Sequence, residues 1–113
     1  MRDRGQAAEA RAAAYLSAQG LHILDRNFRC RFGEIDLIAR DGEALVFVEV
    51  RMRGRDDFGG AAESITAAKR ARLRKAAGFY LSRRRGTPPC RFDAVLVSGT
   101  EGRIEWIRDA FGA

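Results

Sequence analysis

Several features that would assign this chain to a familiar class are absent from its 113 residues. No apolar run approaches 18 residues, the length that a membrane-spanning helix needs, so we predict no membrane span. The N-terminal segment is charged and lacks the apolar core of a signal peptide. With two cysteines and one histidine, the chain offers neither a disulfide framework nor a cysteine–histidine zinc cluster. We therefore predict a cytoplasmic protein whose thiols are reduced.

The sequence also contains no internal repeat, no low-complexity stretch and no Gly-Lys-Ser/Thr ending of a phosphate-binding loop. Its hydrophobic fraction of 46% is enough to form a core, which argues against wholesale disorder. A chain of this length fits one domain, so we predict a single domain over residues 1–113.

Acidic residues are absent from one stretch, residues 69–85, although the net charge of the whole chain is only +6. The stretch holds eight cations, which are Lys69, Arg70, Arg72, Arg74, Lys75, Arg83, Arg84 and Arg85. Positive charge concentrated in one element is typical of a surface that binds phosphates. A solvated helix face is the alternative explanation.

The hydrophobic pattern predicts an α/β fold with the order α-β-β-β-α-β-β. Helices are expected over residues 3–19 and 64–84, and strands over 21–28, 33–39, 44–51, 92–98 and 103–108. The third strand, the second helix and the fourth strand form a βαβ unit, which is right-handed in nearly all proteins. The sheet is therefore expected to be mixed and flanked by helices.

The second and third strands flank Asp41-Gly42, a strong signal for a two-residue hairpin turn. A type I′ turn at these two residues places Asp36 opposite Phe47, and Glu49 opposite Glu34. Because side chains alternate between the faces of a sheet, Asp36 and Glu49 then share one face as diagonal neighbours, roughly 7–8 Å apart at Cα.

The two faces of this predicted hairpin differ sharply in character. The charged face carries Glu34, Asp36, Ile38, Phe47, Glu49 and Arg51. The apolar face carries Ile35, Leu37, Ala39, Val46, Val48 and Val50. Paired carboxylates are hard oxygen ligands, which suit Mg²⁺ or Mn²⁺ better than zinc. The alternative is that the charges protect a sheet edge from pairing with another chain.

The first helix has an apolar stripe with a carboxylate at its margin. The stripe consists of Ala8, Ala12, Tyr15 and Leu16. Glu9 lies at the edge of this stripe, so it is expected either to join the site or to pair with Arg11 or Arg26. Asp93 is the only charge in the fourth strand, and we expect it to pair with Arg91 or with backbone donors.

Together these motifs resemble the YraN family of bacterial proteins. The matching residues are Gly5, Ala8-Glu9, Tyr15-Leu16, Gly33–Ile38, Phe47–Arg51, Phe58-Gly59, Lys69 and Arg91–Asp93. This family is placed among restriction-endonuclease-like folds, close to archaeal Holliday junction resolvases. The resemblance covers nearly the whole chain, with its motifs in the same order.

The resemblance implies a PD-(D/E)xK nuclease core that depends on Mg²⁺ or Mn²⁺. Asp36, Glu49 and the carbonyl of Val50 are then the metal ligands, and Glu9 completes the site through water. Arg51 occupies the position where the motif usually has lysine. Arginine can stabilise a pentacovalent phosphate through its donors, but it cannot act as a general base.

The function predicted from the sequence is therefore metal-dependent hydrolysis of DNA phosphodiesters, with branched DNA included. Arg53, Lys69, Arg70 and Arg72 are expected to bind the DNA backbone, and the resemblance to resolvases implies a homodimer. Two alternatives remain at this point. One is a nucleic-acid-binding protein that has lost hydrolysis, which Arg51 favours, and the other is an adaptor that binds an acidic protein.

Overall fold

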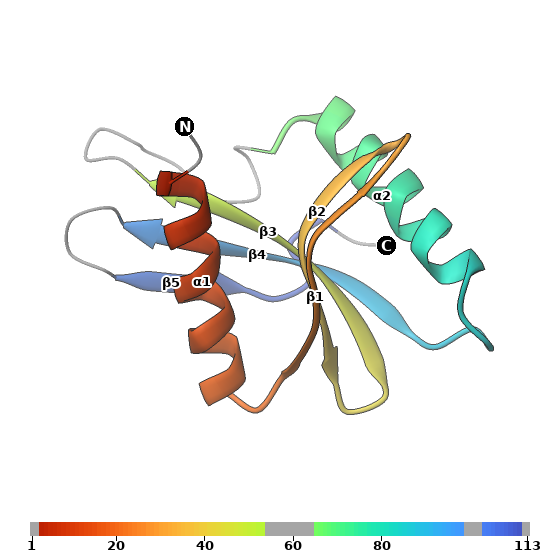
Figure 1. Cartoon of the computed structure of the whole chain (residues 1–113), viewed down its shortest axis with the longest axis horizontal. Helices are drawn as coiled ribbons and strands as arrows, with labels where there is room; N and C mark the ends of the chain where they lie inside the picture. Colours follow the sequence, from red (N-terminus) through yellow and green to blue (C-terminus); the bar gives the residue numbers. More distant parts are fainter. Residues whose placement is uncertain (1–2, 54–64, 99–102, 112–113) are drawn as a thin grey trace.

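The computed structural model describes residues 3–53, 65–98 and 103–111, and its elements follow the predicted order (Figure 1). The elements are α1 (Asp3–Ala18), β1 (His22–Cys30), β2 (Gly33–Asp41), β3 (Ala44–Arg53), α2 (Ala67–Ser82), β4 (Cys90–Ser98) and β5 (Ile104–Ile107). No helix within these ranges is both long and apolar enough to cross a membrane.

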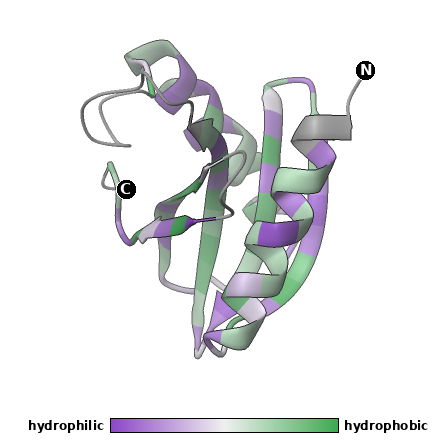
Figure 2. Ribbon diagram, turned by 90° about the vertical axis from the view of Figure 1, so that its left-hand side faces the viewer, coloured by the Kyte–Doolittle hydropathy of each residue, from purple (hydrophilic) through white to green (hydrophobic). Residues whose placement is uncertain are grey.

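The five strands form one mixed sheet in the spatial order β1-β2-β3-β4-β5. Only β3 and β4 are parallel, and α2 connects them, so the predicted βαβ unit is confirmed. All other neighbours are antiparallel. The two helices lie on opposite faces of the sheet, and in Figure 2 the strands between them include strongly hydrophobic segments.

Each face of the sheet has its own buried cluster. Ala8, Ala12 and Leu16 of α1 pack on β-strand residues that include Val46 and Val48, as the predicted stripe requires. On the opposite face, α2 packs on a cluster that extends across β2, β3 and β4. Its members include Ile38, Leu45, Phe47, Leu73, Ala76, Ala77, Tyr80 and Phe92. Ala68, in the first turn of α2, is exposed.

The predicted hairpin register is wrong by two residues. Asp41 pairs with Ala44, so the two-residue loop is Gly42-Glu43 rather than Asp41-Gly42. Gly42 has a φ of 62°, whereas Glu43 is not among the residues with positive φ. Glycine at the first loop position is the pattern of a type II′ turn, and a type I′ turn needs positive φ at both positions. A shift of two residues leaves every side chain on its predicted face.

The predicted apolar face is correct except at Ile35. This residue belongs to the cluster under α2, whereas Leu37 and Ala39 belong to the cluster under α1. The alternation is interrupted at Asp36, because the pairing of β2 with β3 ends at Leu37. In the pairing of β1 with β2, Asp36 lies level with Asn27, whose φ of 55° interrupts the extended backbone.

The second helix begins three residues later than predicted. Thr66 is its N-cap, and the Thr66 hydroxyl accepts a hydrogen bond of 3.1 Å from the backbone N–H of Lys69. Ser64, the expected helix start, lies outside the described residues, as does most of the segment between the predicted third strand and second helix. A cap of this kind satisfies one of the free N–H groups of the first turn. It therefore fixes where the helix starts and orders the first turn, which contains Lys69.

Candidate metal-binding and nucleic-acid-binding site

Asp36 lies where β2 separates from β3, and its side chain replaces part of the missing strand pairing. Its Oδ2 accepts a hydrogen bond of 2.8 Å from the backbone N–H of Val50. That N–H lies beyond the last paired residues of the two strands, Leu37 and Val48. The interrupted ladder thus brings the Asp36 carboxylate to the adjacent residue Glu49.

Glu49 is the buried centre of the cluster, with a side chain that is only 3% exposed. It shares a hydrogen bond with Asp36, so the two carboxyl groups are in direct contact. The Nζ of Lys69 lies 2.8 Å from Glu49 Oε2. A guanidinium nitrogen of Arg51 lies 3.9 Å from the same oxygen. Lysine from α2, rather than arginine from β3, is therefore the close cation of the pair.

Glu9 reaches this cluster from α1, on the other face of the sheet. Its charge raises the pKa of Asp36, so the two carboxyl groups lie near each other. Its Oε1 is buried and has no hydrogen-bond partner in the structure. The alternative pairing with Arg11 or Arg26 does not satisfy this atom. A buried acceptor without a hydrogen-bond partner is expected to bind a water, an ion or a ligand group.

Burial is the main reason why the pKa values of Asp36 and Glu49 are higher than usual. It raises the pKa of Asp36 to about 6, against the lowering effect of the Val50 N–H, and the charge of Glu9 adds to the rise. Burial and the neighbouring charge of Asp36 raise the pKa of Glu49 to about 7, although the Lys69 ammonium opposes this. Near neutral pH the pair therefore carries fewer than two negative charges on average.

These donors fit a hard divalent cation, with additional ligands. Within the described ranges, no three Asp, Glu, His or Cys side chains converge closely enough to hold an ion by themselves. Mg²⁺ commonly takes one or two carboxylates and completes its shell with water and substrate phosphate oxygens. Asp36 and Glu49 supply the carboxylates, the Val50 carbonyl is a further candidate ligand, and Glu9 has a free acceptor for water.

The other charged residues considered from the sequence have different surroundings. Glu34 is exposed and pairs with Arg29 at 3.4 Å. Arg70 donates to the carbonyl of Ile65, and its guanidinium lies 5.6 Å from the ring centroid of Phe111. Two further cations, Arg53 and Arg72, were predicted to bind DNA. The side chain of Arg53 lies outside the described part, and Arg72 is exposed on α2.

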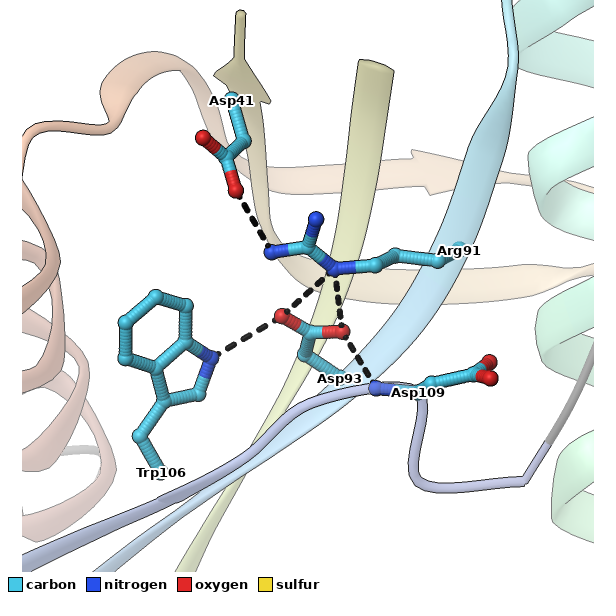
Figure 3. Close-up of polar contacts among 5 residues, drawn as sticks. All are labelled: Asp41, Arg91, Asp93, Trp106 and Asp109. Carbon is cyan, nitrogen blue, oxygen red and sulfur yellow. Dashed lines mark hydrogen bonds and ion pairs between the residues drawn. The ribbon is translucent and has the colours of Figure 1, made fainter.

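Asp93 is fully buried and belongs to a separate polar network, shown in Figure 3. Both of its oxygens accept from Arg91 Nε, at 3.0 and 3.2 Å, which confirms the predicted pairing. Trp106 Nε1 and the backbone N–H of Asp109 also donate to Asp93, each at 2.9 Å. Arg91 in turn donates to Asp41. The network connects the end of β2 with β4 and β5, which indicates a structural role.

Sequence reasoning assigned Lys69 to the DNA backbone and missed its contact with Glu49. The residue is near Glu49 because the helix after β3 returns over the sheet before β4 begins. Its only local signal is its place three residues after Thr66, where an N-cap orients the first turn. That signal indicates where the helix starts, but it does not indicate which residue of the sheet Lys69 contacts.

Comparison with known proteins places these residues in a family context. The model of "Uncharacterised protein family UPF0102" matches residues 8–97, which include Glu9, Asp36, Glu49 and Lys69. The chain belongs to this family. UPF0102 is the YraN family that the sequence motifs indicated, so that prediction is confirmed.

Similar UPF0102 proteins share both the length and the sequence of this chain. One from Nitrosomonas europaea is 60% identical over 96% of this chain and 93% of its own length. Another, from Nitrosospira multiformis, is 58% identical over 98% of this chain and 94% of its own length. A third, from Methylobacillus flagellatus, is 55% identical over the full length of both chains. The whole described fold is therefore a UPF0102 fold.

The carboxyl pair makes the metal-free protein less stable as the pH rises. The pKa values of Asp36 and Glu49 are higher in the folded chain than the ordinary 3.8 and 4.5. Between about pH 4 and 7 the folded state thus binds more protons than the unfolded state, and stability falls with increasing pH. We expect a loss of roughly 3–4 kcal/mol between pH 5 and 8.

Urea denaturation followed by circular dichroism in EDTA measures this loss. Asp36→Asn should reduce it, because the titration of Asp36 and its charge beside Glu49 are lost, whereas the burial of Glu49 retains part of the effect. Glu34→Gln, which removes an exposed carboxylate outside the pair, should retain it. A wild-type stability that stays level or increases from pH 5 to 8, relative to Asp36→Asn, contradicts the prediction.

Proposed function

We propose that this protein is a metal-dependent endonuclease with a restriction-endonuclease-like core, acting on DNA phosphodiesters. The observation that carries the proposal is the contact between Asp36 and Glu49, with Lys69 at 2.8 Å from Glu49. The carboxylates come from neighbouring strands, and Glu9 adds a buried, unsatisfied oxygen from α1. A structural ion pair does not require two adjacent carboxyl groups beside one cation, whereas phosphoryl chemistry with a divalent ion uses such a pair.

Each residue has a specific role in this proposal. Asp36 and Glu49 would hold Mg²⁺ or Mn²⁺, and a bound ion would supply polarisation of the scissile phosphate and a lowered pKa of bound water. The Lys69 ammonium neutralises charge on the phosphate beside Glu49. Arg51, whose side chain is 35% exposed, contacts a phosphate oxygen from the solvent side. Glu9 accepts a hydrogen bond from water and thereby orients it.

The same proposal extends to location and assembly. Cys30 and Cys90 are both free thiols, which suits the cytoplasm. Branched DNA is included among the substrates, and a homodimer is the proposed active form, both by resemblance to junction resolvases. Light scattering on the purified protein tests the dimer directly.

A second function, DNA binding without hydrolysis, is favoured by Arg51. Arginine does not lose its proton at ordinary pH, so it cannot replace a catalytic lysine in proton transfer. The nearby ammonium of Lys69 weakens this objection, because it offers a lysine from another element. A cleavage assay on purified protein separates the two functions.

The assay uses duplex, single-stranded, flap and four-way-junction DNA, each with Mg²⁺, Mn²⁺ or EDTA. Cleavage by the wild type with either metal, lost in EDTA and in Glu49→Gln, is the expected result. If wild type and Glu49→Gln bind these DNAs equally and neither cuts any of them, the nuclease proposal is rejected. DNA binding without hydrolysis then takes its place.

A divalent ion should also stabilise the folded protein measurably. An ion that binds only the folded state raises stability by mass action, about 1.4 kcal/mol at a tenfold excess over its Kd. For a domain of this size that corresponds to a rise in Tm of roughly 5 °C. Thermal denaturation with Mn²⁺ should show this rise in the wild type and not in Asp36→Asn. An equal rise in both proteins places the ion elsewhere.

A further inference from the structure

One flank of α2 carries a row of cations that begins at the carboxyl pair. Arg72, Lys75, Phe79 and Arg83 follow Lys69 at intervals of three or four residues, which places them along one side of the helix. Arg72, Lys75 and Arg83 are all exposed. In the described part of the chain, none of these three forms an ion pair with a carboxylate. Their charge is therefore available to an external anion.

The turn between β1 and β2 adds aromatic surface to this flank. Gly33 lies against the helix, since a Cβ built on it would be 3.6 Å from the Cβ of Arg72. The ring centroids of Phe32 and Phe79 are 6.2 Å apart. Figure 1 shows the tip of this hairpin beside α2. Both rings are half-buried, so each still presents part of its surface to solvent.

A guanidinium accompanies each of these two rings. Arg31 lies 4.9 Å from the centroid of Phe32, and Arg83 lies 5.6 Å from that of Phe79. Aromatic rings and arginine planes that line a basic track are the usual surfaces on which unpaired bases stack. In a duplex the base faces are covered by neighbouring base pairs. Only a single strand therefore uses both the charges and the rings of this flank.

We propose that a single-stranded segment of DNA binds along this flank, with bases on Phe32 and Phe79 and phosphates on Arg72, Lys75 and Arg83. From Lys69 to Arg83 the helix rises about 21 Å, enough for roughly four to six nucleotides. The strand leads to Lys69 and hence to the carboxyl pair. The choice of DNA rests on the proposed function, and the inference names its substrate class: DNA with an unpaired segment.

Fluorescence anisotropy tests the proposal with end-labelled dT12 and a 12-base-pair duplex, in EDTA at 50 and 200 mM KCl. We expect the wild type to bind dT12 more tightly than the duplex. Phe79→Leu, which keeps an apolar side chain but removes the ring, should weaken dT12 binding by about fivefold to tenfold. Binding of the duplex should change by less than about twofold. Phe32→Leu provides a second test if Phe79→Leu folds poorly.

Charge variants provide the matched control. Arg72→Gln combined with Arg83→Gln should weaken binding of dT12 and flatten its salt dependence. Arg108→Gln removes an exposed arginine that lies 4.2 Å from the ring of Trp106, on another element, and should leave binding unchanged. Equal loss with Arg108→Gln overturns the proposal. So does a failure of wild type to prefer dT12, or an equal effect of Phe79→Leu and Phe32→Leu on both DNAs.

These outcomes are independent of cleavage, because EDTA removes the divalent ion. If the dT12 results are as expected and no DNA is cut, single-strand binding along this flank of α2 is supported and the nuclease proposal fails. If DNA is cut but the phenylalanine variants bind dT12 normally, the reverse holds.

Discussion

Lys69→Met should lower the single-turnover rate of DNA cleavage by about 10²–10³-fold, while Arg51→Lys should keep or increase it. The first value is typical for loss of one donor that stabilises transition-state charge. Lys69 Nζ is 2.8 Å from Glu49 Oε2, whereas the Arg51 guanidinium nitrogen is 3.9 Å from the same oxygen, and the two side chains are similarly exposed. The proposed cation next to the metal-bound phosphate is thus Lys69, and Arg51 has an auxiliary role.

Rates at saturating DNA and Kd values should be measured separately, because Lys69 also lies at the start of the proposed single-strand binding flank of α2, so its loss can weaken DNA binding. Lys69→Arg keeps a positive charge and should recover part of the rate. Arg108→Gln serves as the control for loss of one positive charge. Near-normal cleavage by Lys69→Met, together with its loss in Arg51→Ala, would assign the catalytic cation to Arg51 instead.

Asp93→Ala should reduce the free energy of unfolding by about 3–5 kcal/mol, the usual cost of removing one partner of a buried ion pair. Asp93 is 0% exposed and accepts from Arg91, Trp106 and the backbone of Asp109. Its removal leaves the indole and the Asp109 N–H without their acceptor, and a buried donor without a partner is costly. Arg91 keeps only its contact with Asp41.

Urea denaturation followed by far-ultraviolet circular dichroism is the suitable measurement, because Trp106 fluorescence would itself change. Asp41→Asn is the control, since Asp41 is partly exposed and its ion pair with Arg91 should contribute about 1 kcal/mol or less. A loss below about 1 kcal/mol in Asp93→Ala would mean that the network is replaceable. The network would then contribute little to the stability of the fold that positions the site residues.

Local pattern determined most of the architecture. Hydrophobic periods of two and 3.6 residues in the sequence predicted the seven described elements. They could do so because each strand or helix buries one of its own faces, which leaves a pattern within that segment alone. The same alternation predicted that Asp36 and Glu49 lie close together, and they do, although the strand pairing ends before Asp36 and the alternation is interrupted there. Asp93 and Arg91 were paired correctly because they are two residues apart on one strand.

Only the tertiary structure decided what meets at the site. The pairing of β2 with β3 ends before Asp36, which frees its carboxylate for the Val50 N–H and turns Ile35 to the other face. Lys69 reaches Glu49 because α2 crosses the sheet between two parallel strands, a contact between residues 20 positions apart in sequence. Sequence patterns report which side of an element is buried, whereas such long-range contacts depend on how separate elements pack together.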